Sequence, residues 1–267
     1  MKGRFSGVDQ ASSEEKVNKI RILGRKIISI GELKQNYSYG EIAMASSKRL
    51  GLSGKCVYCG RAYTLAGIGR HLISCSRRRE ELSKGKTRKA FIIRVKGRGV
   101  TGYTYWMVVE ANPKLKLSDL DAFLRKQWVE CCGHLSQFTI NGEYYVDERA
   151  REPGEKSMED RLERVLEEGT EFIYEYDFGT TTVLELKVLK VDEGTEKSIK
   201  ILAINEAPQI TCEACGKDTA TQICSECLWE WGKPALFCDK CAEEHEHYEM
   251  LLPLVNSPRT GMCGYTG

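Results

Sequence analysis

The chain has 267 residues, of which 41% are hydrophobic and 29% are charged, and its formal net charge is +2. This composition can form a packed core, and it excludes wholesale disorder and collagen-like or coiled-coil repeats. The sequence has no apolar run as long as the about 18 residues that a membrane-spanning helix needs, and it lacks the apolar stretch of a secretion signal. We therefore expect a modular cytoplasmic protein that does not enter a membrane.

The first 54 residues are predicted to be mainly helical. Ile20, Leu23, Ile27 and Ile30 recur at spacings of three and four, which places them on one face of a helix. A second short helix is predicted over residues 39–50. Residues 1–12 are small and polar, and we expect them to be disordered.

Residues 55–76 are predicted to form a zinc finger. They contain a Cys-x-x-Cys pair followed by two further ligands that are four residues apart, so that both lie on one helical face. Apolar residues between the ligands, including Ile68 and Leu72, can form the small plug of such a finger. The alternative is buried free thiols beside an unrelated histidine. The candidate ligands are Cys56, Cys59, His71 and Cys75.

Residues 77–89 contain glycine and few apolar groups, and we expect a linker there. The small net charge of the whole chain conceals a charge of +11 on residues 55–98 and of −14 on residues 99–267. A cationic finger and linker favour binding of nucleic acid through its phosphates. The alternative is a solvated stripe, or one that docks on the acidic half of the chain. The candidate contacts are Arg70, Arg77, Arg78, Arg79, Lys84, Lys86, Arg88 and Lys89.

Residues 90–206 are predicted to form an α+β domain. Strands are predicted over 90–97 and 103–111, over 135–140 and 143–146 around the turn Asn141-Gly142, and over 171–178 and 182–191. Helices are predicted over 117–130, capped by Ser118, and over 158–169, closed by Gly169. This order predicts a largely antiparallel or mixed sheet with helices on one face, in a β-grasp-like arrangement.

Within this domain, Cys131 and Cys132 precede His134. A thiol beside an imidazole can serve as a nucleophile with its base, and Asp177 is a candidate third group. Free cysteines, however, commonly behave as small buried hydrophobes. We therefore expect the two cysteines to be buried packing residues.

Residues 207–267 are predicted to form a two-zinc module. Six thiols and two imidazoles supply the eight ligands that two tetrahedral zinc ions require. An interleaved, cross-braced grouping like that of B-box domains would join the first and third Cys pairs, and a sequential grouping is the alternative. Cys263 can replace His247 as the eighth ligand. The candidates are Cys212, Cys215, Cys224, Cys227, Cys238, Cys241, His245, His247 and Cys263.

Two stretches of the central domain resemble the plasmid pRiA4b ORF-3-like family, which includes insertion-element passenger resolvase-like proteins. They are LSDLDAFLRKQWVECCGHLSQFTINGEYY and LERVLEEGTEFIYEYDFGTTTVLELKVL. The resemblance covers residues 90 to about 192, and the flanking finger and the ending MLLPLVNSPRTGMCGYTG are similar to one subgroup. Many members carry Asp-Phe-Gly-Asp-x-Trp followed by His, whereas this chain continues from Gly179 with three threonines. The resemblance implies a fold but no defined activity.

These observations favour a non-enzymatic protein with three structural zinc ions that contacts nucleic acid through its finger and linker. Structural zinc is expected because each site has four protein ligands and no open position. The first alternative is an adaptor whose C-terminal module binds a protein partner. The second is an enzyme that uses Cys131 or Cys132 with His134 and Asp177.

Overall fold

The computed structural model describes residues 51–267, so the two helices expected over residues 20–30 and 39–50 and the disorder expected over residues 1–12 lie outside the described residues. The main sheet and a small second sheet contain the strands β1 (Ser53–Cys56), β2 (Ala62–Thr64), β3 (Arg88–Arg98), β4 (Thr104–Ala111), β5 (Ser136–Ile140), β6 (Glu143–Val146), β7 (Lys156–Ser157), β8 (Glu171–Tyr176), β9 (Thr182–Gly194), β10 (Ile199–Asn205), β11 (Gln222–Cys224), β12 (Ala235–Phe237) and β13 (Leu251–Pro253). The α-helices are α3 (Leu65–Ser74), α4 (Ser76–Ser83), α5 (Leu117–Leu124), α6 (Leu162–Val165), α7 (Ser225–Trp231) and α8 (Asp239–Ala242). The π-helix η1 (Arg125–Val129) continues α5, and η2 (Glu148–Ala150) and η3 (Tyr248–Met250) are 3-10 helices.

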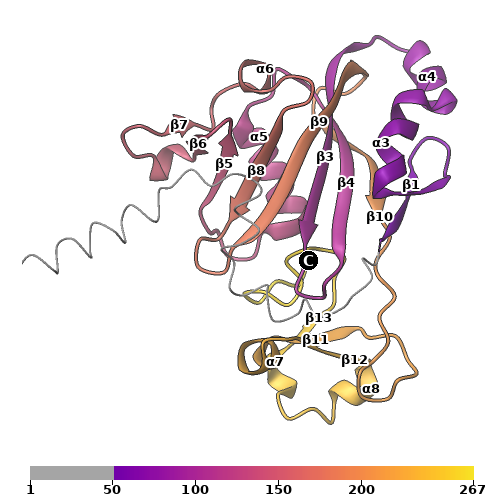
Figure 1. Cartoon of the computed structure of the whole chain (residues 1–267), viewed down its shortest axis with the longest axis vertical. Helices are drawn as coiled ribbons and strands as arrows, with labels where there is room; N and C mark the ends of the chain where they lie inside the picture. Colours follow the sequence, from indigo (N-terminus) through magenta and orange to yellow (C-terminus); the bar gives the residue numbers. More distant parts are fainter. Residues whose placement is uncertain (1–50) are drawn as a thin grey trace, which may run out of the picture. The chain divides into compact units, whose positions relative to one another are not determined.

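The main sheet has ten strands in the order β2-β1-β10-β4-β3-β9-β8-β5-β6-β7 (Figure 1). All neighbouring pairs in it are antiparallel except β6 and β7, which are parallel. The predicted α+β class with a mixed sheet is thus confirmed. The β-grasp-like arrangement is not, since the parallel pair lies at the sheet edge.

The core lies along the central strands. β4 is buried from Tyr105 to Ala111, with Glu110 the one charged residue of that stretch, and β3 contributes Ile93 and Val95, both fully buried. Leucines of α5 and the finger residues Ile68 and Leu72 belong to the same hydrophobic cluster. The finger therefore shares its core with the central domain and is not packed separately.

Several predicted elements are confirmed. The turn between β5 and β6 has positive φ angles at Asn141 (51°) and Gly142 (82°), as a tight hairpin of this sequence requires. β3, β4, β8 and β9 also occur where strands were predicted. The extra strand β10, which was not predicted, pairs with both β4 and β1.

Two helix predictions are wrong in part. The N-terminal cap of α5 is Lys116 rather than Ser118, and the backbone N–H of Lys116 donates to Asp119 Oδ2 at 2.8 Å. The segment 158–169 is helical only over α6. Buried Met158 lies in a turn before that helix. Its N–H donates to Val146 O and its carbonyl accepts from the Ser118 N–H, so tertiary contacts override the helical pattern there.

The expected boundary between the finger and the central domain is not seen. β1 pairs with β10, and Trp106 Nε1 donates to Leu52 O at 3.0 Å, so the finger hairpin continues the main sheet. A Cβ atom at Gly54 would collide with Ile204 O, which explains a glycine at this close strand contact. The predicted linker, residues 77–89, is also wrong: it forms most of α4 and the start of β3.

The C-terminal segment forms the three-stranded sheet β12-β11-β13 with α7 and α8. In Figure 1 the chain then returns from β13 toward the end of the β3–β4 hairpin, where it terminates. Among residues 51–267, no helix combines the length and apolar character that a membrane crossing needs.

Candidate metal centres

Four groups of Cys and His side chains converge in the described structure, and each can hold a metal ion. In each group the four ligand atoms lie within 4.8 Å of one another. We call them the finger cluster (Cys56, Cys59, His71, Cys75), the four-cysteine cluster (Cys212, Cys215, Cys238, Cys241), the two-histidine cluster (Cys224, Cys227, His245, His247) and the tail cluster (Cys131, Cys132, His134, Cys263).

The spacing of the donor atoms can be compared with a tetrahedral zinc site. With Zn–S near 2.3 Å and Zn–N near 2.1 Å, two sulfurs would be about 3.8 Å apart and a sulfur and a nitrogen about 3.6 Å apart. In the two-histidine cluster, Nδ1 of His247 is 3.8 Å from Cys224 Sγ and 3.7 Å from Cys227 Sγ, and Nε2 of His245 is 3.4 Å from Cys227 Sγ. These donors thus already have the separations of tetrahedral corners.

The finger cluster is built by β1, the turn to β2 and the end of α3. Gly60, with φ 70°, closes the turn by donating to Cys56 O at 2.8 Å, which brings both thiols of the Cys-x-x-Cys pair to one side. Nε2 of His71 lies 3.3 Å from Cys59 Sγ, and the Tyr63 ring stacks on the imidazole at 4.0 Å. Burial lowers the pKa of His71, which favours the neutral imidazole that binds metals.

The four-cysteine cluster contains an ionisable thiol that the backbone stabilises. Burial opposes ionisation of Cys212, but backbone N–H groups, among them that of Cys215, outweigh it and lower its pKa to about 6. The pKa of Cys241 is raised to about 12 by its hydrogen bond with Cys238 and by the neighbouring sulfurs. A divalent cation would remove the mutual repulsion of these thiolates, so the cluster chemistry suits a thiolate-bound ion such as zinc.

The two C-terminal clusters have the interleaved grouping. The first Cys-x-x-Cys pair of this module meets the third, and the second pair meets both histidines, so the sequential alternative does not occur. His247, not Cys263, completes the two-histidine cluster. Cys263 is instead in the tail cluster, where Sγ of Cys132 lies 3.9 Å away.

The tail cluster was not anticipated as a metal site. Cys132 is exposed, so the expectation that it is a buried packing residue is wrong. The groups of the enzymatic alternative do meet here, since His134 Nε2 is 2.9 Å from Cys132 Sγ and 3.5 Å from Asp177 Oδ2. Cys263 adds a third thiol at 3.3 Å from the same nitrogen, which a nucleophile–base pair does not need.

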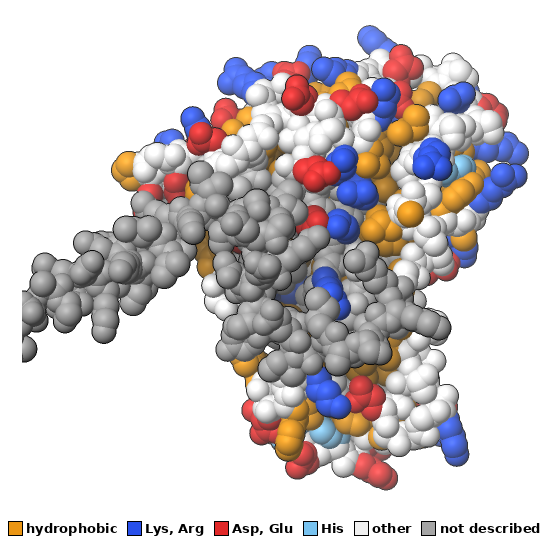
Figure 2. Space-filling view, viewed as in Figure 1, with side chains coloured by type: hydrophobic (Ala, Val, Ile, Leu, Met, Phe, Trp, Pro, Cys, Tyr) orange, Lys and Arg blue, Asp and Glu red, His pale blue; other side chains and the backbone are white. Residues whose placement is uncertain are grey.

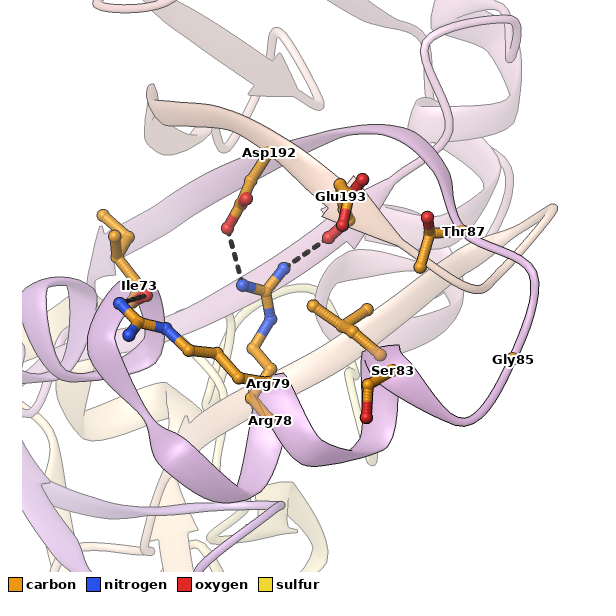
Figure 3. Close-up of a pocket in the computed structure, with 9 residues that line it drawn as sticks. Ile73, Arg78, Arg79, Ser83, Gly85, Thr87, Asp192 and Glu193 are labelled. Atoms are coloured by element: carbon orange, nitrogen blue, oxygen red, sulfur yellow. Dashed lines mark hydrogen bonds and ion pairs between the residues drawn. The ribbon is translucent and has the colours of Figure 1, made fainter.

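One predicted phosphate contact lies inside the protein. Arg78 of α4 is 1% exposed and points into a pocket of about 580 Å³ between α4 and β9 (Figure 3). Its guanidinium donates to Asp192 Oδ2 and to Glu193 O, both at 2.6 Å, and lies 3.7 Å from buried Glu110. Burial opposes ionisation of Asp192, but the bond to Arg78 outweighs it and lowers the Asp192 pKa. Arg78 anchors α4 and cannot meet a nucleic acid.

The other predicted cations lie at or near the surface. Figure 2 shows Lys and Arg side chains gathered along the edge where Figure 1 places α3 and α4. Arg88 is half-buried. Arg77 lies 3.7 Å from Glu80, and Lys84 pairs with Glu80 and Glu81, so part of the positive charge is compensated locally. The exposed members are Arg70, Arg77, Arg79, Lys84, Lys86 and Lys89.

The fold and these clusters together define an α+β protein that can hold metal ions in several Cys/His sites. The family model described as plasmid pRiA4b ORF-3-like protein matches residues 90–251, which is more than half of the chain, so the protein belongs to this family.

Among solved structures, the chain is similar to a protein of unknown function, MM3350 from Methanosarcina mazei Go1. The two share 17% identity with a TM-score of 0.37 over 43% of this chain and 67% of that one. No curated protein matches the chain.

Proposed function

We propose that the protein is a zinc-stabilised, non-enzymatic protein that binds nucleic acid through the surface of α3, α4, the loop to β3 and the start of β3. The exposed cations on this surface carry the proposal: Arg70, Arg77, Arg79, Lys84, Lys86 and Lys89. Among the described residues, Arg70 and Lys86 have no ion-pair partner, so they can be offered to phosphates.

The buried arginine supports this proposal indirectly. Arg78 holds one face of α4 against β9 through its bonds to Asp192 and Glu193. Its neighbours Arg77 and Arg79 are consequently directed to solvent, and both are exposed. The finger cluster orders the preceding helix α3 in the same way. A polyanion would thus meet a preorganised surface, which lowers the entropy cost of binding.

Charge reversal of this surface is expected to weaken the binding of nucleic acids whatever their base sequence. Six phosphate contacts predict a logarithmic salt slope of about −5 on duplex DNA and about −4 on a single strand. Arg77→Glu/Arg79→Glu should reduce the magnitude of that slope by about two. The measurement is fluorescence anisotropy with labelled mixed-sequence duplex DNA, single-stranded DNA and single-stranded RNA over a salt series.

The matched control is Arg149→Glu/Arg164→Glu. These exposed arginines lie in η2 and α6, and the double variant changes the net charge by the same amount. It should leave the slope within error of the unmodified protein. Equal losses in both double variants, or no loss in the first, would contradict a localised interface.

A protein partner for the C-terminal module is the second candidate. Large apolar side chains are exposed there, with Trp229 at 61% and Trp231 at 66% on α7. Tyr248 and Met250 are also exposed on η3, and Ser225 Oγ donates to Met250 O at 3.0 Å, which places η3 beside the start of α7. Exposed aromatic clusters of this kind are enriched in protein interfaces.

The adaptor function predicts a specific pattern in pull-downs from nuclease-treated extract. A partner protein should be retained by the unmodified chain and lost with Trp229→Ala/Trp231→Ala, because truncating two central aromatic side chains costs several kcal/mol of binding, about 2 kcal/mol or more each. Zinc content should stay unchanged in this variant. Retention of the same protein by both chains would place its contact elsewhere.

A further inference from the structure

We propose that Cys131, Cys132, His134 and Cys263 bind a fourth zinc ion, and that this ion fastens the C-terminal tail, residues 254–267, to the central domain. The number of candidate ligands in the chain supports a fourth site. The full sequence has 12 cysteines and 4 histidines. Every one of them lies in one of the four clusters, and each cluster has four members. The chain therefore carries the ligands of four tetrahedral ions with none left over.

The donor atoms of the tail cluster have the separations of a tetrahedral site. Sγ of Cys132 is 3.6 Å from Cys131 Sγ and 3.9 Å from Cys263 Sγ, against about 3.8 Å around a zinc ion. Nε2 of His134 is 2.9 Å and 3.3 Å from the sulfurs of Cys132 and Cys263, against about 3.6 Å. Small movements outward would admit the ion. Three thiolates and one imidazole are the same donor set as in the finger cluster.

The tail reaches this position through contacts that do not depend on a metal. Arg259 is fully buried, and it donates to Asp177 Oδ2 at 2.7 Å and to Thr182 Oγ1 at 3.0 Å. Ser257 Oγ donates to Trp128 O at 2.7 Å. Cβ atoms at Gly97 and Gly99 would crowd Pro258, so the hairpin glycines leave room for the tail. These contacts place Cys263 next to thiols more than 100 residues earlier in the chain.

The surroundings select the four ligands. The Asp177 carboxylate lies 3.5 Å from His134 Nε2, but Arg259 and the backbone N–H groups of Gly179 and Thr180 already occupy its oxygens. Arg259 Nη2 also lies 3.4 Å from Cys131 Sγ, as a donor to a metal-bound thiolate would. Soft thiolate donors with one imidazole favour zinc over magnesium or calcium.

Accessibility distinguishes this site from the other three. Cys132 and Cys263 are exposed, whereas every other cluster has at least two buried ligands. A chelator should therefore remove this ion first. The tail would then keep its buried Arg259 contacts but lose its clamp near the C-terminus.

The test is elemental analysis of the full chain purified under reducing conditions. We expect four zinc ions per chain, three in Cys132→Ser/Cys263→Ser, and four in the control Thr266→Ala, an exposed change in the same tail. Two ligands cannot retain the ion, and both replaced side chains are exposed, so the fold should persist by circular dichroism. Three ions in the unmodified protein, or four in the double variant, would overturn the proposal.

Thiol alkylation of the unmodified protein gives an independent reading. Cys132 and Cys263 should resist iodoacetamide in the zinc-loaded protein despite their exposure, and should react first after brief chelation. Alkylation of both at the rate of free thiols in loaded protein would overturn the proposal, and reactivity of Cys131 or Cys132 would revive the enzymatic alternative. Nucleic-acid binding does not enter either readout, so failure of the proposed function leaves this result intact.

Discussion

Replacing Cys238 by serine is expected to unfold the C-terminal module over residues 207–253 while the ten-stranded sheet stays folded. Of the six buried residues in the core around this cysteine, four are cysteines of the two clusters: Cys212, Cys224, Cys227 and Cys238. Apolar burial is therefore too small to hold the module, and a structural zinc site contributes an apparent free energy of about 10–16 kcal/mol. Because the two clusters interleave, loss of one ion should also release the other.

Hydrogen exchange measured by mass spectrometry separates the two parts of the chain. Amides of β11, β12 and β13 should exchange at unfolded rates in Cys238→Ser, while those of β3 and β9 remain protected. Lys240→Ser is the control, since Lys240 is exposed and lies between the ligands Cys238 and Cys241. Native protection of β11 in Cys238→Ser would show that zinc does not hold this module.

Replacing Arg78 by methionine is expected to destabilise the main sheet by about 3–5 kcal/mol. The change leaves Glu110, which is 1% exposed, and the partly buried Asp192 without their counter-charge. The loss should appear as a lower urea midpoint of tryptophan fluorescence, which reports the buried Trp106 and Trp128. The salt slope of nucleic-acid binding should stay the same, because Arg78 meets no phosphate.

The neighbouring exposed arginine supplies the control for this variant. Arg77→Met should change the free energy of unfolding by no more than about 0.5 kcal/mol, as is usual for an exposed side chain. Arg77→Met should, however, reduce the magnitude of the salt slope of nucleic-acid binding by about one. The opposite pattern, with Arg78 controlling binding and Arg77 controlling stability, would show that Arg78 faces the solvent and Arg77 the protein interior.

Local patterns predicted much of this molecule because they depend on near neighbours in the chain. Asn141-Gly142 specified its hairpin through backbone conformations that few residues adopt. The Cys-x-x-Cys pairs and the spacing of His71 and Cys75 marked three of the four clusters. The interleaved grouping of the C-terminal ligands was one of the two predicted alternatives, because the spacing of the ligands does not determine which pairs meet.

The features that the sequence did not predict depend on partners that are far apart in the chain. Residues 77–89 were predicted to be a linker because few of them are apolar. Arg78 is nevertheless buried, and it bonds to Asp192, which lies 114 residues later. The tail cluster joins Cys132 to Cys263 across 131 residues, and its adjacent cysteines lack a recognised ligand spacing. A full count of cysteines and histidines was the available signal, because assigning twelve ligands to three sites left Cys131, Cys132, His134 and Cys263 or His247 unexplained.

We propose that the Cys and His clusters fold around tightly held divalent ions. Native mass spectrometry of the full chain, purified without added metal and sprayed from neutral buffer, tests it most directly. We expect a compact charge-state distribution at the mass of the chain with four zinc ions, which becomes extended when a strong chelator removes them. A compact, metal-free chain that ignores the chelator would contradict it.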